Sequence, residues 1–183
     1  MTKKVPLFPE LTTKRLKLRR VEQDDLDVLH GCFSDPQAMV FWGWPVSKST
    51  VESERLLAIF AKTSSPYDHF AWAITDKKSD RCLGVVNYHH REQRHRRLEI
   101  GYIVAAAHRR KGIATEAVAA MLDFCERELK VHRFNALIAP ENAASLRLVE
   151  RLGFVCEGGP LQDYWCVDGA FQSVMIYGRV AGT

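Results

Sequence analysis

The sequence predicts an α/β fold, in the α+β sense, with a mixed central sheet of about seven strands flanked by about four helices. Residues 70–74 alternate, a turn and a second strand-like run at 83–88 follow, and the chain then leads into a β-rich segment at 98–104, a pattern typical of an antiparallel meander. A long segment with helical periodicity then separates residues 98–104 from a further strand at 133–139, so these two strands can lie parallel in a βαβ unit. No internal repeat or linker divides the chain, which favours one domain over residues 1–183.

The bulk composition is that of an ordinary globular protein. The formal net charge is +4 and 46% of the residues are hydrophobic, so a nucleic-acid partner is not expected. The N-terminus leads directly into charged residues and prolines, and no run of 18 apolar residues occurs. We therefore expect neither a signal peptide nor a membrane partner, and a cytoplasmic location follows as the default.

One strand and two helices are predicted before the meander. Residues 16–19 alternate as a strand, and residues 24–33 carry apolar side chains at helical spacing with acidic residues in the first turn. A second helix begins at Ser49, which can form a capping box with Glu52, and continues through Phe60. We expect this second helix to have a structural role.

The segment between these two helices is rich in aromatic residues. Residues 39–45 include Phe41, Trp42 and Trp44 but are interrupted by Gly and Pro, which predicts a loop or a short helix. Two roles stay open for it. The aromatic side chains can line a substrate pocket, or they can cap the hydrophobic core.

The second half of the chain predicts two more helices and the last strands. The helix that begins near Ile113 is amphipathic and ends near residues 129–130. A second helix at 145–152 is closed by a glycine and followed by a strand at 154–156, and a last strand covers 173–180.

A basic turn precedes the helix that begins near Ile113. It contains Arg109, Arg110, Lys111 and Gly112. The unpaired N–H groups of a first helical turn and the positive end of the helix dipole attract anions, and the three cations add countercharge. The spacing is neither that of the nucleotide P-loop nor that of the dinucleotide fingerprint, so a different phosphate-bearing ligand is indicated. The alternative is a solvated helix start with incidental charge.

This turn belongs to a set of motifs that together resemble the GNAT superfamily of acetyl-CoA-dependent N-acetyltransferases. The family signature is Gln or Arg, two residues, Gly, one residue, then Gly or Ala, and Arg109, Gly112 and Ala114 fill its three fixed positions. Further motifs are similar to the branch that contains the ribosomal-protein N-terminal acetyltransferases, and the similarity spans about residues 11–180. These motifs are Thr13 to Arg19, Asp35-Pro36, Glu99 to Tyr102, Asn142 with Ser145, Leu152 to Phe154, Asp163 to Trp165 and Val167 to Gly169.

The resemblance implies acetyl-CoA as cosubstrate, without a metal, on a sheet with a splayed pair of parallel strands. Backbone groups freed by the splay would pair with the pantetheine amides, and the helix start would bind the pyrophosphate. A homodimer is also common in the family, and no pattern here decides the oligomeric state. The implied cofactor-binding residues are Tyr102, Ile103, Val104, Arg109, Arg110, Lys111, Gly112, Ile113, Ala114, Thr115, Asn142 and Ser145.

Two residues are candidates for the chemistry, which is direct attack of a neutral amine on the thioester in a ternary complex. Glu99, on the central strand, is the candidate general base, acting through an ordered water. Its alternative role is an ion pair with Arg94, Arg96 or Arg97, or orientation of the substrate. By resemblance, Ser145 lies near the coenzyme sulfur and can protonate or stabilise the leaving thiolate. The alternative for Ser145, as for Asn142, is a local helix cap.

The acceptor site is the least defined part of the prediction. We expect Phe41, Trp42, Trp44, Asp163 and Tyr164 to wall it, although Tyr164 can also serve in packing. The favoured acceptor is a protein N-terminal amine, as in ribosomal protein acetylation. Alternatives are a small amine, such as a polyamine, an antibiotic or an amino acid derivative, and a non-catalytic CoA-binding module.

Two clusters are expected to lie outside the chemistry. His89, His90 and His95 could suggest a metal site, but no carboxylate or Cys stands at ligand spacing and strand neighbours point to opposite faces. The five cysteines are odd in number and form no Cys-x-x-Cys pair, which favours reduced thiols and offers no zinc motif.

The basic stretch 91–97 is interpreted as a solvated hairpin, with docking of RNA as its alternative.

Overall fold

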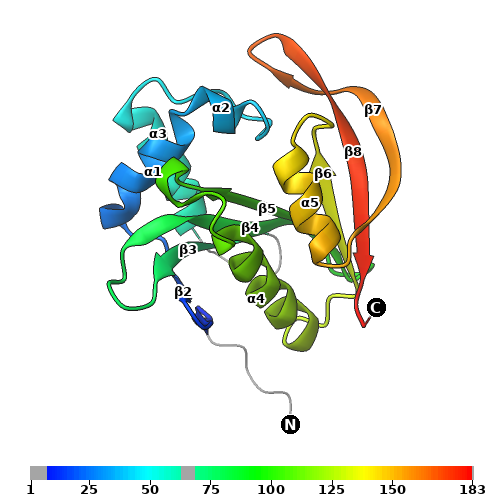
Figure 1. Ribbon diagram of the computed structural model, residues 1–183, viewed down its shortest axis with the longest axis horizontal. Coiled ribbons are helices and arrows are strands. Elements are labelled where there is room, and N and C mark those ends of the chain that lie inside the picture. The colour runs from blue at the N-terminus through cyan, green and yellow to red at the C-terminus, as the bar shows by residue number, and fades with distance from the viewer. Residues whose placement is uncertain (1–7, 63–68, 183) are drawn as a thin grey trace.

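A mixed eight-stranded sheet organises the computed structural model, which describes residues 8–62 and 69–182 (Figure 1). The strand order is β1-β2-β3-β4-β5-β6-β8-β7, and β5 and β6 are its parallel pair. The strands are β1 Leu11–Thr12, β2 Leu16–Arg19, β3 Phe70–Asp76, β4 Cys82–Glu92, β5 Arg97–Val104, β6 Arg133–Ile138, β7 Val155–Val167 and β8 Ala170–Val180.

Five α-helices and two 3-10 turns complete the described part of the chain. They are η1 Gln23–Asp25, α1 Leu26–Phe33, α2 Pro36–Met39, α3 Thr50–Ala61, η2 Ala106–His108, α4 Ile113–Arg127 and α5 Ala143–Arg151. The predicted fold class is confirmed, with one more strand and one more helix than expected. The additions β1 and α2 have two and four residues, too few for a periodic pattern to reveal. Within the described residues, no helix combines the length and apolar character that crossing a membrane requires.

The two faces of the sheet carry separate hydrophobic cores. Alternation along β3 explains the division: Phe70, Trp72 and Ile74 point to the face covered by α4, whereas Ala71 and Ala73 point to the face covered by α1 and α3 (Figure 1). The bulky side chains of β3 therefore fill the layer under α4, and its small side chains let α1 and α3 approach the strand closely.

Strands β5 and β6 separate soon after they meet. Their parallel pairing is confined to three residues of each strand, from Arg97 opposite Arg133 to Glu99 opposite Asn135. Beyond this point β5 continues to Val104 and β6 to Ile138. The predicted splay of the parallel pair is thus present, and the opening between the two strands is where the site forms.

Several element boundaries differ from the sequence prediction. β7 runs from Val155 to Val167 and forms a long hairpin with β8, although only residues 154–156 were predicted (Figure 1). It is an exposed edge strand with three register shifts, so its residues do not alternate and Gly158, Gly159 and Pro160 hide its β character. β4 extends through Glu92 into the segment predicted as a charged link, and α4 ends at Arg127 rather than near 129–130.

Candidate active site

Two adjoining cavities lie where β5 leaves β6. The first, which we call the splay cavity, has a volume of about 560 Å³ and lies between β5, α5 and the start of α4. The second, which we call the histidine cavity, has a volume of about 460 Å³ and lies over the facing parts of β4 and β5. Phe41 and Trp42 line both cavities, so the loop after α2 forms the boundary between them.

The splay cavity gathers all but one of the residues that the resemblance implied for acetyl-CoA. The exception is Lys111, whose ammonium group donates to the Ala107 carbonyl at 2.8 Å and does not line the cavity. The predicted residues that line it are Tyr102, Ile103, Val104, Arg109, Arg110, Gly112, Ile113, Ala114, Thr115, Asn142 and Ser145.

The turn before α4 is built as an anion-binding helix start. Gly112 is the N-cap residue with φ +74°, a left-handed conformation that glycine adopts without steric cost. The N–H groups of Ile113 and the next two residues belong to the first turn and have no acceptor within the helix. Arg15, in the bend just before β2, holds the turn, because its Nη1 donates to the Lys111 carbonyl at 2.9 Å and its Nε to Glu116 at 2.6 Å.

The predicted cation Arg109 is already engaged inside the protein. Its Nη2 lies 2.7 Å from Asp35 Oδ2 and its Nε donates to the Val104 carbonyl at 3.0 Å. Burial is the largest single influence on Asp35 and raises its pKa, but the hydrogen bond and charge of Arg109 and the backbone N–H groups of α2 together outweigh burial, so the pKa of Asp35 falls below its usual range. Arg109 therefore anchors the end of β5 to α2 more than it supplies a mobile countercharge.

Two cations that the sequence analysis missed line the splay cavity from α5. Arg147 and Arg151 stand four residues apart on the helix and therefore share one face. The four-residue spacing is visible in the sequence. That this face of α5 lines the cavity follows only from the position of α5 beside the opening. With Arg110 they bring three guanidinium groups to the cavity wall, beside the start of α4.

Asn142 and Ser145 form the start of α5. Asn142 is the N-cap, and its Oδ1 accepts a hydrogen bond from the Ser145 N–H at 3.1 Å, so the capping role proposed for Asn142 is present. The Ser145 side chain makes a different contact, since its Oγ lies 2.5 Å from the Tyr102 hydroxyl on β5. Burial raises the pKa of Tyr102 to about 12, with the Ser145 bond acting in the opposite direction, so the phenol keeps its proton.

The unpaired edge of β5 is partly occupied by side chains. The Trp42 indole N–H donates to the Tyr102 carbonyl at 3.2 Å, and the Arg109 Nε donates to the Val104 carbonyl at 3.0 Å. These two carbonyls lack a β6 partner and recruit other donors, because buried backbone groups need a partner. The expectation that the splay leaves free backbone groups is therefore wrong for these two carbonyls.

The histidine cavity contains most of the predicted acceptor residues. Phe41, Trp42, Trp44 and Tyr164 line it, whereas Asp163 does not. Asp163 directly precedes Tyr164 in β7, and consecutive residues of a strand normally point to opposite faces, so the two predicted residues do not share the cavity wall. Trp165, within the region 163–169 that was also expected to wall the acceptor site, lines the cavity, whereas the sequence analysis missed several other lining residues, among them Phe60, His69, Asn87, His89 and His90.

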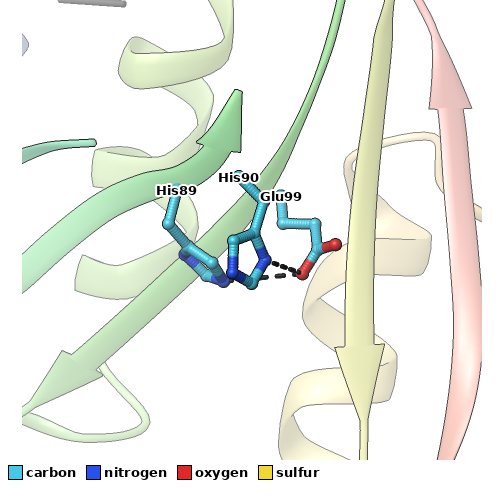
Figure 2. Close-up of side chains that lie close together, drawn as sticks. All are labelled: His89, His90 and Glu99. Atoms are coloured by element: carbon cyan, nitrogen blue, oxygen red, sulfur yellow. Dashed lines mark hydrogen bonds and ion pairs between the residues drawn. The ribbon is translucent and has the colours of Figure 1, made fainter. Parts of the chain in front are cut away.

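Glu99 lines this cavity beside two histidines, whose rings approach its carboxylate from the same side (Figure 2). Its Oε2 is 3.2 Å from His90 Nδ1 and 3.5 Å from His89 Nε2. These histidines, and not the arginines at 94, 96 or 97, are its ion-pair partners within the described chain. The His89 bond lowers the pKa of Glu99 most, burial opposes it and His90 adds to it, with a net shift below the usual value.

The argument against a histidine cluster is wrong on both of its grounds. A carboxylate is present, because the β4–β5 register pairs His89 with Glu99 across the strands. The two consecutive histidines also reach the same oxygen, because His90 has φ +48° at a register shift in β4 and the normal alternation is lost. Neither the register nor the irregularity is visible in a single sequence.

The chain is similar to known proteins over most of its length. The model of the acetyltransferase (GNAT) domain matches residues 15–155. The N-acetyltransferase p20 of Bacillus licheniformis is 30% identical over 167 residues, covering 91% of this chain and 93% of p20. A spermidine N(1)-acetyltransferase of Vibrio cholerae is 27% identical over 160 residues, covering 87% of this chain and 90% of that protein.

Solved structures show the same fold over nearly the whole chain. Spermidine N-acetyltransferase from Vibrio cholerae, solved with CoA and spermine, superposes with a TM-score of 0.78 at 26% identity, covering 92% of this chain and 96% of that one. RimL, a ribosomal L7/L12 alpha-N-protein acetyltransferase, shares the fold with a TM-score of 0.81 at 19% identity and 94% coverage of both chains. The family match, together with relatives that extend over most of the chain, shows that the protein belongs to the GNAT family of acetyl-CoA-dependent N-acetyltransferases.

Proposed function

We propose that acetyl-CoA binds in the splay cavity and that its acetyl group passes to a primary amine held in the histidine cavity. The observation that carries this proposal is the placement of two residues on β5. Tyr102 lines the splay cavity and Glu99, three residues earlier on the same strand, lines the histidine cavity. One strand therefore presents the two reactants to each other where the cavities meet.

The phosphates of coenzyme A fit the start of α4. The first-turn N–H groups point their partial positive charge at an anion, and Arg110 supplies countercharge from the turn. Arg147 and Arg151 add guanidinium groups from the opposite wall, and arginine suits phosphate because it can donate two parallel hydrogen bonds. We assign these three arginines, rather than Arg109 or Lys111, as the main phosphate partners.

Acetyl-CoA supplies the activated acyl group, and the protein moves the protons. We assign to Glu99 the binding of the acceptor ammonium group and the removal of its proton, directly or through a water. Both imidazoles contact Oε2, so among the contacts of the described residues Oε1 is the oxygen left for a ligand. At the other end of the reaction, Ser145 donates its hydroxyl proton to the departing thiolate and takes a proton from Tyr102, and Tyr102 is in turn reprotonated from water, so no phenolate remains.

The charge of the histidine cavity bears on the class of acceptor. Among the described lining residues Glu99 is the one carboxylate, and His69, His89 and His90 accompany it. A polyamine carries several positive charges, which a single carboxylate beside three imidazoles pairs poorly. Aromatic side chains form the rest of the wall, and Trp42 and Trp44 offer an apolar surface for a neighbouring side chain. We therefore propose a single α-amino group at a protein N-terminus, such as that of a ribosomal protein, as the acceptor.

A polyamine is the second candidate, because the spermidine N(1)-acetyltransferase of Vibrio cholerae is similar over most of this chain. A direct comparison of acceptors decides between them. Purified protein is incubated with acetyl-CoA and with peptides of varied first residue, the same peptides blocked at the N-terminus, spermidine or spermine. Release of CoA and the mass of the product are measured.

We expect acetylation of the free peptides at their α-amino group and none of the blocked controls that lack lysine. A higher kcat/KM for spermidine than for every peptide would favour the polyamine. Binding of CoA without amine-dependent release for any acceptor would support a non-catalytic CoA-binding module.

We also propose a cytoplasmic location. The five cysteines are free thiols, and Cys156 and Cys166 are exposed, which suits a reducing compartment. Fractionation of cells that express the full chain tests this location, and light scattering of the purified protein tests the homodimer that the family resemblance suggests.

A further inference from the structure

Three metal-binding atoms converge on the wall of the histidine cavity. They are His89 Nε2, His90 Nδ1 and a carboxylate oxygen of Glu99, and all lie within 4.8 Å of one another (Figure 2). Two imidazoles and one carboxylate are a donor set that zinc and related divalent transition metals prefer. We propose that these residues form a binding site for one such metal ion, which acts not as a cofactor of acetyl transfer but as a competitor of the amine.

The distances suit four-coordinate binding. Bonds of about 2.0–2.1 Å in a tetrahedron place neighbouring donor atoms about 3.3 Å apart. In this protein Glu99 Oε2 lies 3.2 Å from the His90 nitrogen and 3.5 Å from the His89 nitrogen. Two of the three donor separations therefore already match those of metal ligands, and the third is within 4.8 Å.

The backbone brings the two histidines together. Consecutive residues of a strand normally point to opposite faces, which would separate His89 from His90. The left-handed conformation of His90 and the register shift between His89 and Glu92 cancel this separation. A residue with a Cβ atom seldom adopts that conformation, so the convergence is a specific feature of this hairpin.

A buried amide is placed to support His89. A histidine that binds metal through Nε2 carries its proton on Nδ1 and needs an acceptor there. Asn87 Nδ2 lies 3.2 Å from His89 Nδ1, and Asn87 Oδ1 is buried without a hydrogen-bond partner. A half-turn of the Asn87 amide would bring Oδ1 to His89 Nδ1, where it would accept the proton that a metal-bound His89 carries, and would move Nδ2 to the position that Oδ1 leaves. Gly101 makes room for this amide, since a Cβ there would lie 2.7 Å from Oδ1.

Metal binding and amine binding use the same carboxylate. A cation on Oε2 neutralises the charge that would attract the acceptor ammonium group, and it fills the space beside Glu99. The metal should therefore raise the KM of the amine without changing the KM of acetyl-CoA, whose site is the splay cavity. This consequence rests on the proposed function, whereas the binding of the metal does not.

The test begins with metal alone. Untagged, chelator-treated protein is titrated with Co²⁺ and followed by visible absorption, and Zn²⁺ is then added to displace it. We expect one Co²⁺ per chain, a spectrum of nitrogen and oxygen ligands without a thiolate charge-transfer band, and displacement by Zn²⁺.

Variants locate the site. H89A, H90A and E99Q should each weaken Co²⁺ binding at least tenfold, and N87A should weaken it severalfold through His89. H95A is the matched control, because His95 is an exposed histidine on the same hairpin outside the cluster, and it should bind like the parent. Circular dichroism checks that each variant is folded, and exposed His90 provides a substitution that leaves the core intact.

Three results would overturn the metal site. They are absence of stoichiometric binding, equal binding by H90A and H95A, and loss of binding in the double variant C156S/C166S, which would place the metal on exposed thiols. Initial rates with a mass readout then test competition. If the metal binds as predicted but the KM of the amine does not change, the metal site stands and the placement of the amine beside Glu99 is refuted. Absence of any acetylation would refute the proposed function and leave the Co²⁺ result standing.

Discussion

The hydroxyl groups of Tyr102 and Ser145 lie 2.5 Å apart across the opening between β5 and α5. Asn142 fixes the backbone of Ser145 by capping α5, and burial keeps the Tyr102 phenol protonated with a pKa of about 12. The pair therefore forms a short proton-donating chain that is held from two different elements. Its position on the splay cavity is where a leaving thiolate would need a proton.

Replacing Ser145 tests this chain directly. We expect Ser145→Ala to lower kcat by about 10- to 100-fold, near or below the lower end of general acid effects, because a thiolate is already a fair leaving group. Tyr102→Phe should cause a smaller loss, since Ser145 would still reach solvent for its proton. Steady-state rates at saturating acetyl-CoA measure both, and an unchanged kcat in Ser145→Ala would remove Ser145 from the chemistry.

The role of Glu99 predicts a loss on the amine side. Glu99→Gln keeps the shape but removes the charge and the proton acceptor, so kcat/KM for the amine should fall about 100-fold. The KM of acetyl-CoA should not change. Glu92→Gln, at an exposed position of β4, is the matched control and should behave like the parent. Equal activity of the two variants would argue against any role of Glu99 in proton transfer.

The α5 arginines predict a separate effect on the cofactor. Arg147→Ala and Arg151→Ala should each raise the KM of acetyl-CoA about 3- to 5-fold, because an exposed charge contact contributes up to about 1 kcal/mol. Lys111→Ala should change it less, since that side chain is turned to Ala107. Arg127→Ala, at the far end of α4, serves as control. The ranking is read from KM values at low and high salt, and a larger effect of Lys111 would reverse our assignment.

The turn after β3 predicts a pH-dependent contribution to stability. A hydrogen bond from Thr75 is the main cause that lowers the pKa of Asp80; partial burial opposes it and Arg19 adds to it. A carboxyl whose pKa is lower in the folded state stabilises the protein above its unfolded pKa of about 3.9. That stabilisation is lost as the pH falls through the lower folded pKa.

Asp80→Asn should therefore reduce the free energy of unfolding at pH 7 by less than about 1 kcal/mol, since solvent screens this half-exposed group. The difference from the parent should shrink toward zero near pH 3. Asp168→Asn makes the same change at another left-handed residue and controls for the backbone. Urea unfolding at the two pH values measures the difference, and a constant difference would exclude the ionic contribution.

Local patterns in the sequence were sufficient for the meander, the βαβ unit and the start of α4. Alternation along β3 and the apolar stripe of α4 depend only on residues a few positions apart, and Gly112 marks its own turn. The family motifs added the cofactor residues, nearly all of which line one cavity. Most of β7 was not predicted, because an edge strand with bulges has no buried face that would require apolar and polar residues to alternate.

The sequence by itself determined the fold class, the family and the strand–turn–helix to which we assign acetyl-CoA, because each is encoded in short-range patterns. Tertiary structure alone decided which charges are free. Arg109 is paired with Asp35, 74 residues away, and Arg147 reaches the cavity only because α5 lies beside the opening. It also placed His89 and His90 on Glu99, since that contact depends on strand register and on one left-handed residue. Such contacts join distant segments, and no local spacing records them.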